Sequence, residues 1–142
     1  MPRSVILPLS IAGLIVIGCA DSSRMKVYPV SGKVTYKGEP AVGAEIAFFG
    51  LDEELKKPEA PFPKAVVSAD GSFSLSSYAP GDGAPMGNYA ITIVWKKSEA
   101  ADPEIRETVR DTLRGRYASP ETSPLAAEVQ PRNNELPVFE LK

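Results

Sequence analysis

Apolar and polar residues alternate along several short segments of this chain, which is the pattern of a β-strand with one buried face. The longest such run, residues 89–96, places Tyr89, Ile91, Ile93 and Trp95 on one face and smaller or polar residues on the other. We therefore expect the first face to lie in the core. The same pattern predicts further strands at residues 30–36, 44–49, 65–68, 72–76, 125–129 and 135–141.

Turn residues separate these segments. Asp70-Gly71 predicts a tight turn, because glycine readily adopts the positive φ that such turns require. We expect this turn to join residues 65–68 and 72–76 as the clearest hairpin of the sequence. The turn at 37–40 leads into 44–49, which forms either a hairpin with the preceding strand or a corner between two sheets.

Two residues inside the strands interrupt their regular pattern. Gly32 takes an inward position in strand 30–36, so it marks a bulge or a close approach of another group to the backbone. Pro137 indicates that the last strand lies at a sheet edge or carries a bulge. The proline-rich segment 50–64 predicts an exposed, irregular loop.

One short amphipathic helix or helical loop is expected between Asp102 and Gly115. Asp102 followed by proline is a favourable helix start, and Ile105, Val109 and Leu113 recur at four-residue steps. The charged residues of this segment fit a solvated helix face better than a catalytic set; they are Glu104, Arg106, Glu107, Arg110, Asp111 and Arg114.

The N-terminal residues have the layout of a secretory signal sequence. Arg3 supplies a positive charge, and residues 5–17 are apolar apart from Ser10. As a helix these residues would be about 20 Å long, against about 30 Å of hydrocarbon in a bilayer. We therefore expect a leader and not a permanent transmembrane helix.

The end of this apolar run, Val16, Ile17, Gly18 and Cys19, resembles the lipobox of bacterial lipoproteins. The resemblance implies cleavage between Gly18 and Cys19, lipid attached to the Cys19 thiol, and a mature protein that begins at Cys19. Two or three acyl chains bind a membrane lastingly, since each buried methylene contributes about 0.8 kcal/mol. The alternatives are an ordinary leader with an incidental thiol, and an uncleaved anchor. Residues 20–26 show no apolar period, and we expect a disordered tether there.

Composition narrows the chemistry available to the chain. It contains no histidine, which removes the usual general base near neutral pH and the commonest zinc ligand. The formal net charge is −2, which argues against a general nucleic-acid surface. Cys19 is the one cysteine, so no disulfide within the chain is expected. We expect no enzymatic activity, no cofactor and no metal.

The strand count and the turns favour an all-β fold, a small seven-stranded β-sandwich with at most one short helix; a closed barrel is the alternative. The sequence resembles bacterial lipoproteins that carry a carboxypeptidase regulatory-like domain, a transthyretin-like or prealbumin-like Greek-key sandwich. The residues that carry the resemblance are 30–34 with Gly38 and Pro40, 68–75, 81–89 and 115–125. The expected organisation is a signal peptide at 1–18, a lipidated N-terminus and tether at 19–27, and the sandwich domain at 28–142.

The resemblance implies no peptidase activity, because the family is named after a non-catalytic domain of carboxypeptidases. Some transthyretin-like proteins hydrolyse 5-hydroxyisourate at a site that contains histidine, and this chain has none.

A few other residues are candidates for chemistry. Asp70, Asp82 and Asp102 carry oxygen ligands suited to calcium, but they form no D-x-D-x-D-G loop, and the first two are explained by turn geometry. The aromatic side chains that could bind a sugar are expected to pack in the core instead; they are Tyr78, Tyr89, Trp95 and Tyr117. Ser119 and Ser123 precede prolines in a loop, and nothing nearby would activate them.

Two functions follow from these observations. The first is an envelope lipoprotein facing outside the cytoplasm, anchored to the membrane through Cys19, whose domain is a non-catalytic structural or binding module for an envelope protein or glycan. The second is a carboxylate-based, metal-dependent accessory factor or hydrolase that uses the loop 81–88. A pocket shared by Asp70 and Asp82 would favour the second.

Overall fold

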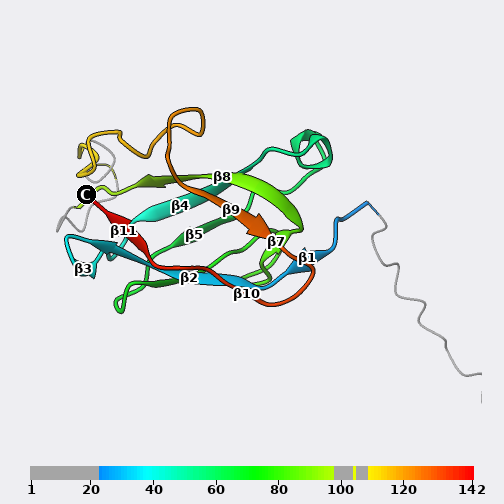
Figure 1. The fold of residues 1–142 in the computed structure, drawn as a ribbon, viewed down its shortest axis with the longest axis horizontal. Helices are drawn as coiled ribbons and strands as arrows, with labels where there is room; N and C mark the ends of the chain where they lie inside the picture. The colour runs from blue at the N-terminus through cyan, green and yellow to red at the C-terminus, as the bar shows by residue number, and fades with distance from the viewer. Residues whose placement is uncertain (1–22, 98–103, 105–108) are drawn as a thin grey trace, which may run out of the picture.

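A computed structural model describes residues 23–97, 104 and 109–142 (Figure 1). The leader, the Cys19 segment and Asp102 lie outside the described residues. The elements are β1 (Val27–Tyr28), β2 (Val30–Tyr36), β3 (Glu39–Pro40), β4 (Glu45–Gly50), the 3-10 helix η1 (Glu53–Lys56), β5 (Lys64–Val66), β6 (Ser72–Ser74), β7 (Ala84–Pro85), β8 (Gly87–Val94), β9 (Ala126–Val129), β10 (Asn134–Glu135) and β11 (Phe139–Leu141).

Two sheets form the two layers of the described part, as Figure 1 shows. The first is four-stranded and antiparallel, in the order β5-β4-β8-β9. The second is built on β2, which pairs antiparallel with β3 and β6 and parallel with β10 and β11. The short strands β1 and β7 form a separate antiparallel pair. The all-β class expected from the sequence is therefore confirmed.

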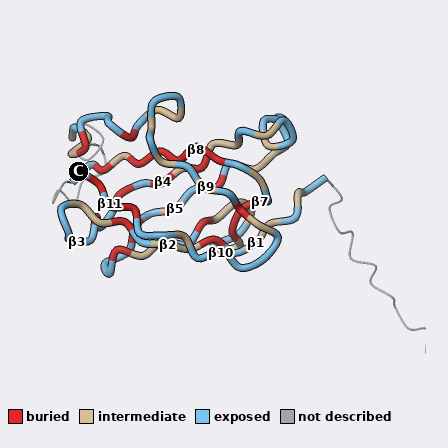
Figure 2. The backbone as a smooth tube through the Cα atoms, viewed as in Figure 1, coloured by how far each residue is buried: buried red, intermediate tan, exposed pale blue. Residues whose placement is uncertain are grey.

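The core lies between these two sheets (Figure 2). Val34 of one sheet and Phe48 of the other belong to one buried cluster, as does Ile93, which is 0% exposed. The inward face predicted for residues 89–96 is confirmed, because Tyr89, Ile91, Ile93 and Trp95 are all buried. Two outward neighbours in β8, Ala90 and Thr92, are buried as well, which alternation does not predict.

The strand connections decide whether the turn at 37–40 belongs to a hairpin with 44–49 or to a corner between two sheets. Strands β2 and β4 belong to different sheets, so the segment 37–44 turns a corner.

The turn at Asp70-Gly71 is confirmed: Gly71 has φ +84° and the Ser68 N–H donates to the Ser72 carbonyl at 2.8 Å. The predicted hairpin is only partly correct, because β5 pairs with β4 and β6 pairs with β2. The two strands meet only at the Lys64–Ser76 bridge and at the turn.

Gly32 and Pro137 behave as their positions predict. A Cβ atom at Gly32 would lie 2.8 Å from the Phe73 ring, so the close approach is confirmed. Residues 136–138, which include Pro137, separate β10 from β11 along the edge of β2. The predicted last strand is therefore an interrupted edge strand.

The helix predicted for 102–115 is only partly correct: Glu104 is helical, but residues 109–115 form bends, turns and irregular structure. The cause is a tertiary contact of Asp111, whose carboxylate accepts hydrogen bonds from the N–H groups of Trp95 (2.9 Å), Leu113 (3.0 Å) and Gly115 (2.9 Å). Gly115 lies in this turn with φ +72°. No helix in the described ranges has the length and hydropathy needed to cross a membrane.

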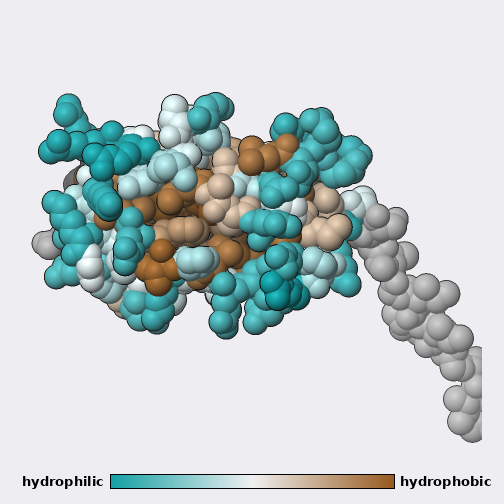
Figure 3. All heavy atoms as spheres, in the orientation of Figure 1, coloured by the Kyte–Doolittle hydropathy of each residue, from teal (hydrophilic) through white to brown (hydrophobic). Residues whose placement is uncertain are grey.

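Apolar side chains also reach the surface along one side of the domain. On the face drawn in Figure 3 they form a band through the middle, between hydrophilic margins. Leu125, Ala127 and Leu136 are half-buried and pack against the core. Leu125 directly precedes β9 and Ala127 lies in β9, the edge strand of the four-stranded sheet. Leu136 lies in the break between β10 and β11, at the edge of the other sheet.

Candidate functional site

Asp70 and Asp82, the two candidate calcium ligands that the structure describes, each stabilise a separate turn. The Asp70 carboxylate accepts hydrogen bonds from the hydroxyl (2.6 Å) and the N–H (3.0 Å) of Ser72, and these bonds hold the pKa of Asp70 below its ordinary value. Asp70 precedes β6, whereas Asp82 lies in the loop that follows it, so the two are beyond opposite ends of that strand. They form no common site.

Asp82 organises its own loop. Its carboxylate accepts hydrogen bonds from the N–H groups of Ser77 (2.7 Å), Tyr78 (3.0 Å) and Ala79 (2.9 Å). Partial burial acts to raise the pKa of Asp82, but these N–H groups outweigh it, and the pKa lies below its ordinary value. Within the described residues no three His, Cys, Asp or Glu side chains gather as a metal site.

The aromatic residues proposed as a sugar platform are buried, with one exception. Tyr89 and Trp95 belong to the core cluster, as their place on the inward face of 89–96 predicts, and Tyr117 belongs to it as well. The Tyr89 hydroxyl donates to the Pro85 carbonyl at 2.8 Å, and burial raises the pKa of this phenol. Tyr78 is half-buried and contacts the residues that precede β1. The arrangement therefore leaves no exposed aromatic platform among these four residues.

The candidate site is a pocket of about 520 Å³ at the end of the domain where residues 23–26 join it, which we call the tether-end pocket. Four segments distant in sequence line it, namely 25–28, 52–55, 85–87 and 128–131. Its volume is in the range of small-molecule sites, about 300 to 1,000 Å³. Met86 is 58% exposed at this pocket, so apolar surface is open to solvent there.

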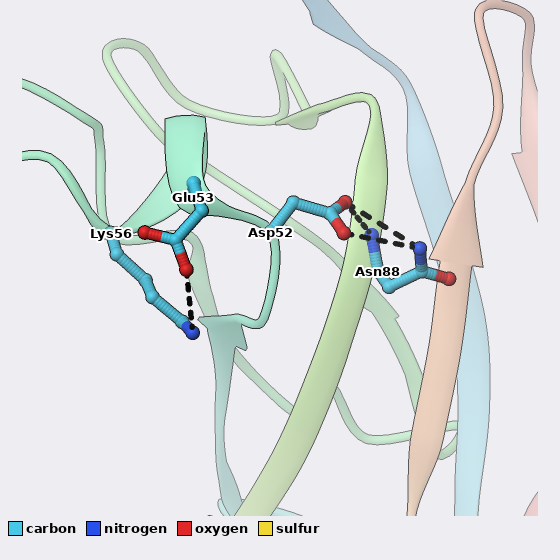
Figure 4. Close-up of polar contacts among 4 residues, drawn as sticks. All are labelled: Asp52, Glu53, Lys56 and Asn88. Carbon is cyan, nitrogen blue, oxygen red and sulfur yellow. Dashed lines mark hydrogen bonds and ion pairs between the residues drawn. The ribbon is translucent and has the colours of Figure 1, made fainter.

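One wall of the pocket is held in place by Asp52 (Figure 4). The Asp52 carboxylate accepts hydrogen bonds from the backbone N–H of Asn88 at 2.8 Å and from the Asn88 side-chain amide at 3.3 Å. Asp52 occupies the position before η1 but makes no side-chain hydrogen bond to that helix. Its carboxylate therefore ties the helix to β8 instead of capping it.

Glycine makes this contact possible. A Cβ atom at Gly87 would lie 2.5 Å from the Asp52 carboxylate and 2.7 Å from a Leu55 methyl group. Gly87 also has φ +142°, a conformation that other residues rarely adopt. A side chain at Gly50 would likewise collide with Leu55. Because Gly50 and Gly87 have no side chains, Leu55 can approach their backbone closely. Leu55 packs against the core and forms part of the pocket wall.

The sequence pattern missed this wall. It predicted an exposed irregular loop at 50–64, whereas the segment contains η1, the half-buried Leu55 and the buried Pro63. Gly87, the first residue of the strongly apolar strand β8, is a local signal that another group approaches the backbone there.

The residues that precede β1 also contact the domain. The Met25 N–H donates to the Tyr78 hydroxyl at 3.1 Å, and the Arg24 guanidinium lies 5.0 Å from the centre of the Tyr78 ring. The Lys26 ammonium lies 5.3 Å from the centre of the Tyr28 ring. The expectation of a disordered tether is therefore wrong for Arg24 to Lys26, whose contacts place Met25 and Lys26 in the pocket lining.

Replacing Asp52 with alanine is expected to lower the free energy of unfolding by about 1 to 2 kcal/mol, because the Asn88 N–H loses a charged acceptor. The matched control is Glu53→Ala. Glu53 faces solvent and its carboxylate lies 3.6 Å from the Lys56 ammonium (Figure 4), so its loss should cost less than about 0.5 kcal/mol. Urea unfolding of both variants measures the difference, and equal losses would contradict this role of Asp52.

Comparisons with known proteins found no match: no family model, no curated protein and no solved structure is significantly similar to this chain.

Proposed function

We propose that this chain is a lipid-anchored lipoprotein of the bacterial cell envelope whose β domain is a non-catalytic binding module. The lipobox-like residues Val16 to Cys19 support the anchor, and they stand at the end of an apolar run too short to span a bilayer comfortably. Five residues lie between Cys19 and Met25, so six residue steps connect the anchor to Met25, which already contacts the domain. At about 3.4 Å per extended residue, the anchor holds the tether-end pocket within about 20 Å of the lipid.

We further propose that the domain is a transthyretin-like, seven-stranded Greek-key sandwich of the carboxypeptidase regulatory-like kind. Apart from the two-residue strands, β6-β2-β11 and β5-β4-β8-β9 account for the two sheets. The chain passes repeatedly from one of these sheets to the other, at β2 to β4, β5 to β6, β6 to β8 and β9 to β11. Such crossings between packed sheets are typical of Greek-key sandwiches. The proposal rests on this strand order and on the residues that carry the family resemblance.

The observation that carries the binding role is the tether-end pocket. Its open surface is largely aliphatic and thioether, which suits an apolar group of a partner or ligand. Two of its carboxylates already have partners: Asp52 holds Asn88, and the Glu54 carboxylate lies 2.7 Å from the Lys57 ammonium. These features support a role in holding an apolar group, and the charged residues Lys26 and Glu128 also line the pocket.

Methionine methyl resonances test this role directly. Residues 20–142 contain two methionines, Met25 and Met86, and both line the pocket. With the methyl groups labelled with carbon-13, titration with 1-hexanol should shift both signals and reach saturation. Linear shifts without saturation would contradict a binding pocket.

Met86→Asp should weaken hexanol binding about tenfold, read from the Met25 signal, because a charge replaces apolar surface. Val138→Asp is the matched control, since Val138 is 48% exposed and does not line the pocket. Equal weakening by the two substitutions would place binding elsewhere.

A further inference from the structure

On the outward face of the four-stranded sheet, half of the side chains in the two rows next to β5 are apolar. A sheet face in contact with water normally carries polar residues. By strand register, the side chains on this face are Val66, Glu45 and Val94 in one row and Lys64, Ala47 and Thr92 in the next. Val66 is 61% exposed, so apolar surface is open to solvent at the sheet edge.

This face is also hollow. A cavity of about 580 Å³ is lined by the small side chains of Ala47 and Thr92, together with Phe62, Val66 and Val94. Phe62 is 49% exposed, and its ring packs edge-on against Phe49 with the ring centres 4.9 Å apart. An exposed apolar hollow of this kind marks a surface that another molecule covers.

Stacking on the face is favoured over strand addition at β5, because backbone groups on that edge already have partners. The Lys64 N–H donates to the Ser76 carbonyl at 3.2 Å, and the Ser76 N–H donates to the Lys64 carbonyl at 3.0 Å. The Ser68 N–H likewise donates to Ser72 at 2.8 Å. These bonds take up backbone groups that an added strand would need.

The two charges on this face identify the occupant. Glu45 and Lys64 are both exposed and lie on diagonally opposite sides of the Ala47–Val66 centre. In the described part of the chain neither forms an ion pair or a side-chain hydrogen bond. A face with one acid and one base on either side of an apolar centre is complementary to its own copy under two-fold rotation.

We propose that a second copy of this chain stacks on this face about a two-fold axis. Glu45 of each copy then lies opposite Lys64 of the other, and the exposed Phe62 and Val66 side chains of each copy cover the hollow of the other. This dimer is independent of the tether-end pocket, whose lining shares no residue with the hollow.

Disulfide trapping in the full chain tests the dimer. Val66 lies next to the proposed axis, so Val66→Cys should form a cross-linked dimer on mild oxidation. Val138→Cys is the matched control, because Val138 is comparably exposed but belongs to the break between β10 and β11 in the other sheet. The wild-type chain is the second control: its one cysteine is Cys19, so any cross-linking that it shows arises through Cys19. Cross-linking of Val66→Cys no greater than that of the two controls would overturn the proposal.

Charge exchange then tests the two-fold pairing. In the Val66→Cys chain, Lys64→Glu should reduce the cross-linked fraction about tenfold, because two ion pairs become two like-charge contacts. Adding Glu45→Lys reverses both charges and should restore cross-linking. An unchanged fraction with Lys64→Glu, or no restoration by the second substitution, would overturn the pairing, and circular dichroism verifies that each variant is folded.

Discussion

Ile93→Asp is expected to unfold the domain. Ile93 is fully buried in β8, opposite Ile46 of β4, within the cluster that both sheets share. The carboxylate would have no polar partner there, and burying it costs more than about 4 kcal/mol. Domains of this size are commonly stable by only about 5 to 15 kcal/mol, so most or all of the folding free energy would be lost.

Thermal unfolding followed by circular dichroism measures this effect against two controls. Ile93→Val removes one methylene group and should cost about 1 kcal/mol. Val42→Asp introduces the same charge at a side chain that is exposed, and its melting temperature should stay close to that of the native chain. If the Ile93→Asp variant had the same melting temperature as the native chain, the inward face of β8 would be wrongly assigned.

Strand β8 shows what could be predicted from local sequence. Its alternation identified the inward residues correctly, because a period of two fixes which side chains share a face. The burial of Thr92 on the opposite face was not predictable from that period. It depends on how other segments pack around β8, whose neighbouring strands β4 and β9 are set by tertiary pairing.

The errors also have tertiary causes. Turn chemistry at Asp70-Gly71 was read correctly, but no local feature tells that β5 and β6 pair with different sheets. At 109–115 the predicted helix does not form, because Asp111 binds the backbone of Trp95 and of two residues of its own turn instead. A contact between distant segments therefore overrides a weak local preference.

The candidate site was the least predictable part. Asp52 and Asn88 are far apart in sequence, and each lies in a segment that reads as a loop or a strand start. Their contact arises only when η1 folds onto the backbone at Gly87. Asp70 and Asp82, which the sequence did single out, turned out to serve their own turns.

The second large effect is expected at Cys19. If this thiol carries the lipid, Cys19→Ser removes the attachment point completely, because a serine hydroxyl does not form the thioether. The folded domain should be unaffected, since its described core begins after the tether, at Val30. Loss of the lipid with retention of the fold would demonstrate that the domain folds independently of the anchor.

Metabolic labelling with a radioactive fatty acid tests the anchored-module account most directly. Bacteria that express the native chain should yield one labelled protein in the membrane fraction, and the Cys19→Ser chain should carry no label. Labelling of the Cys19→Ser chain at the native level, or a native chain that stays unlabelled, would contradict the account.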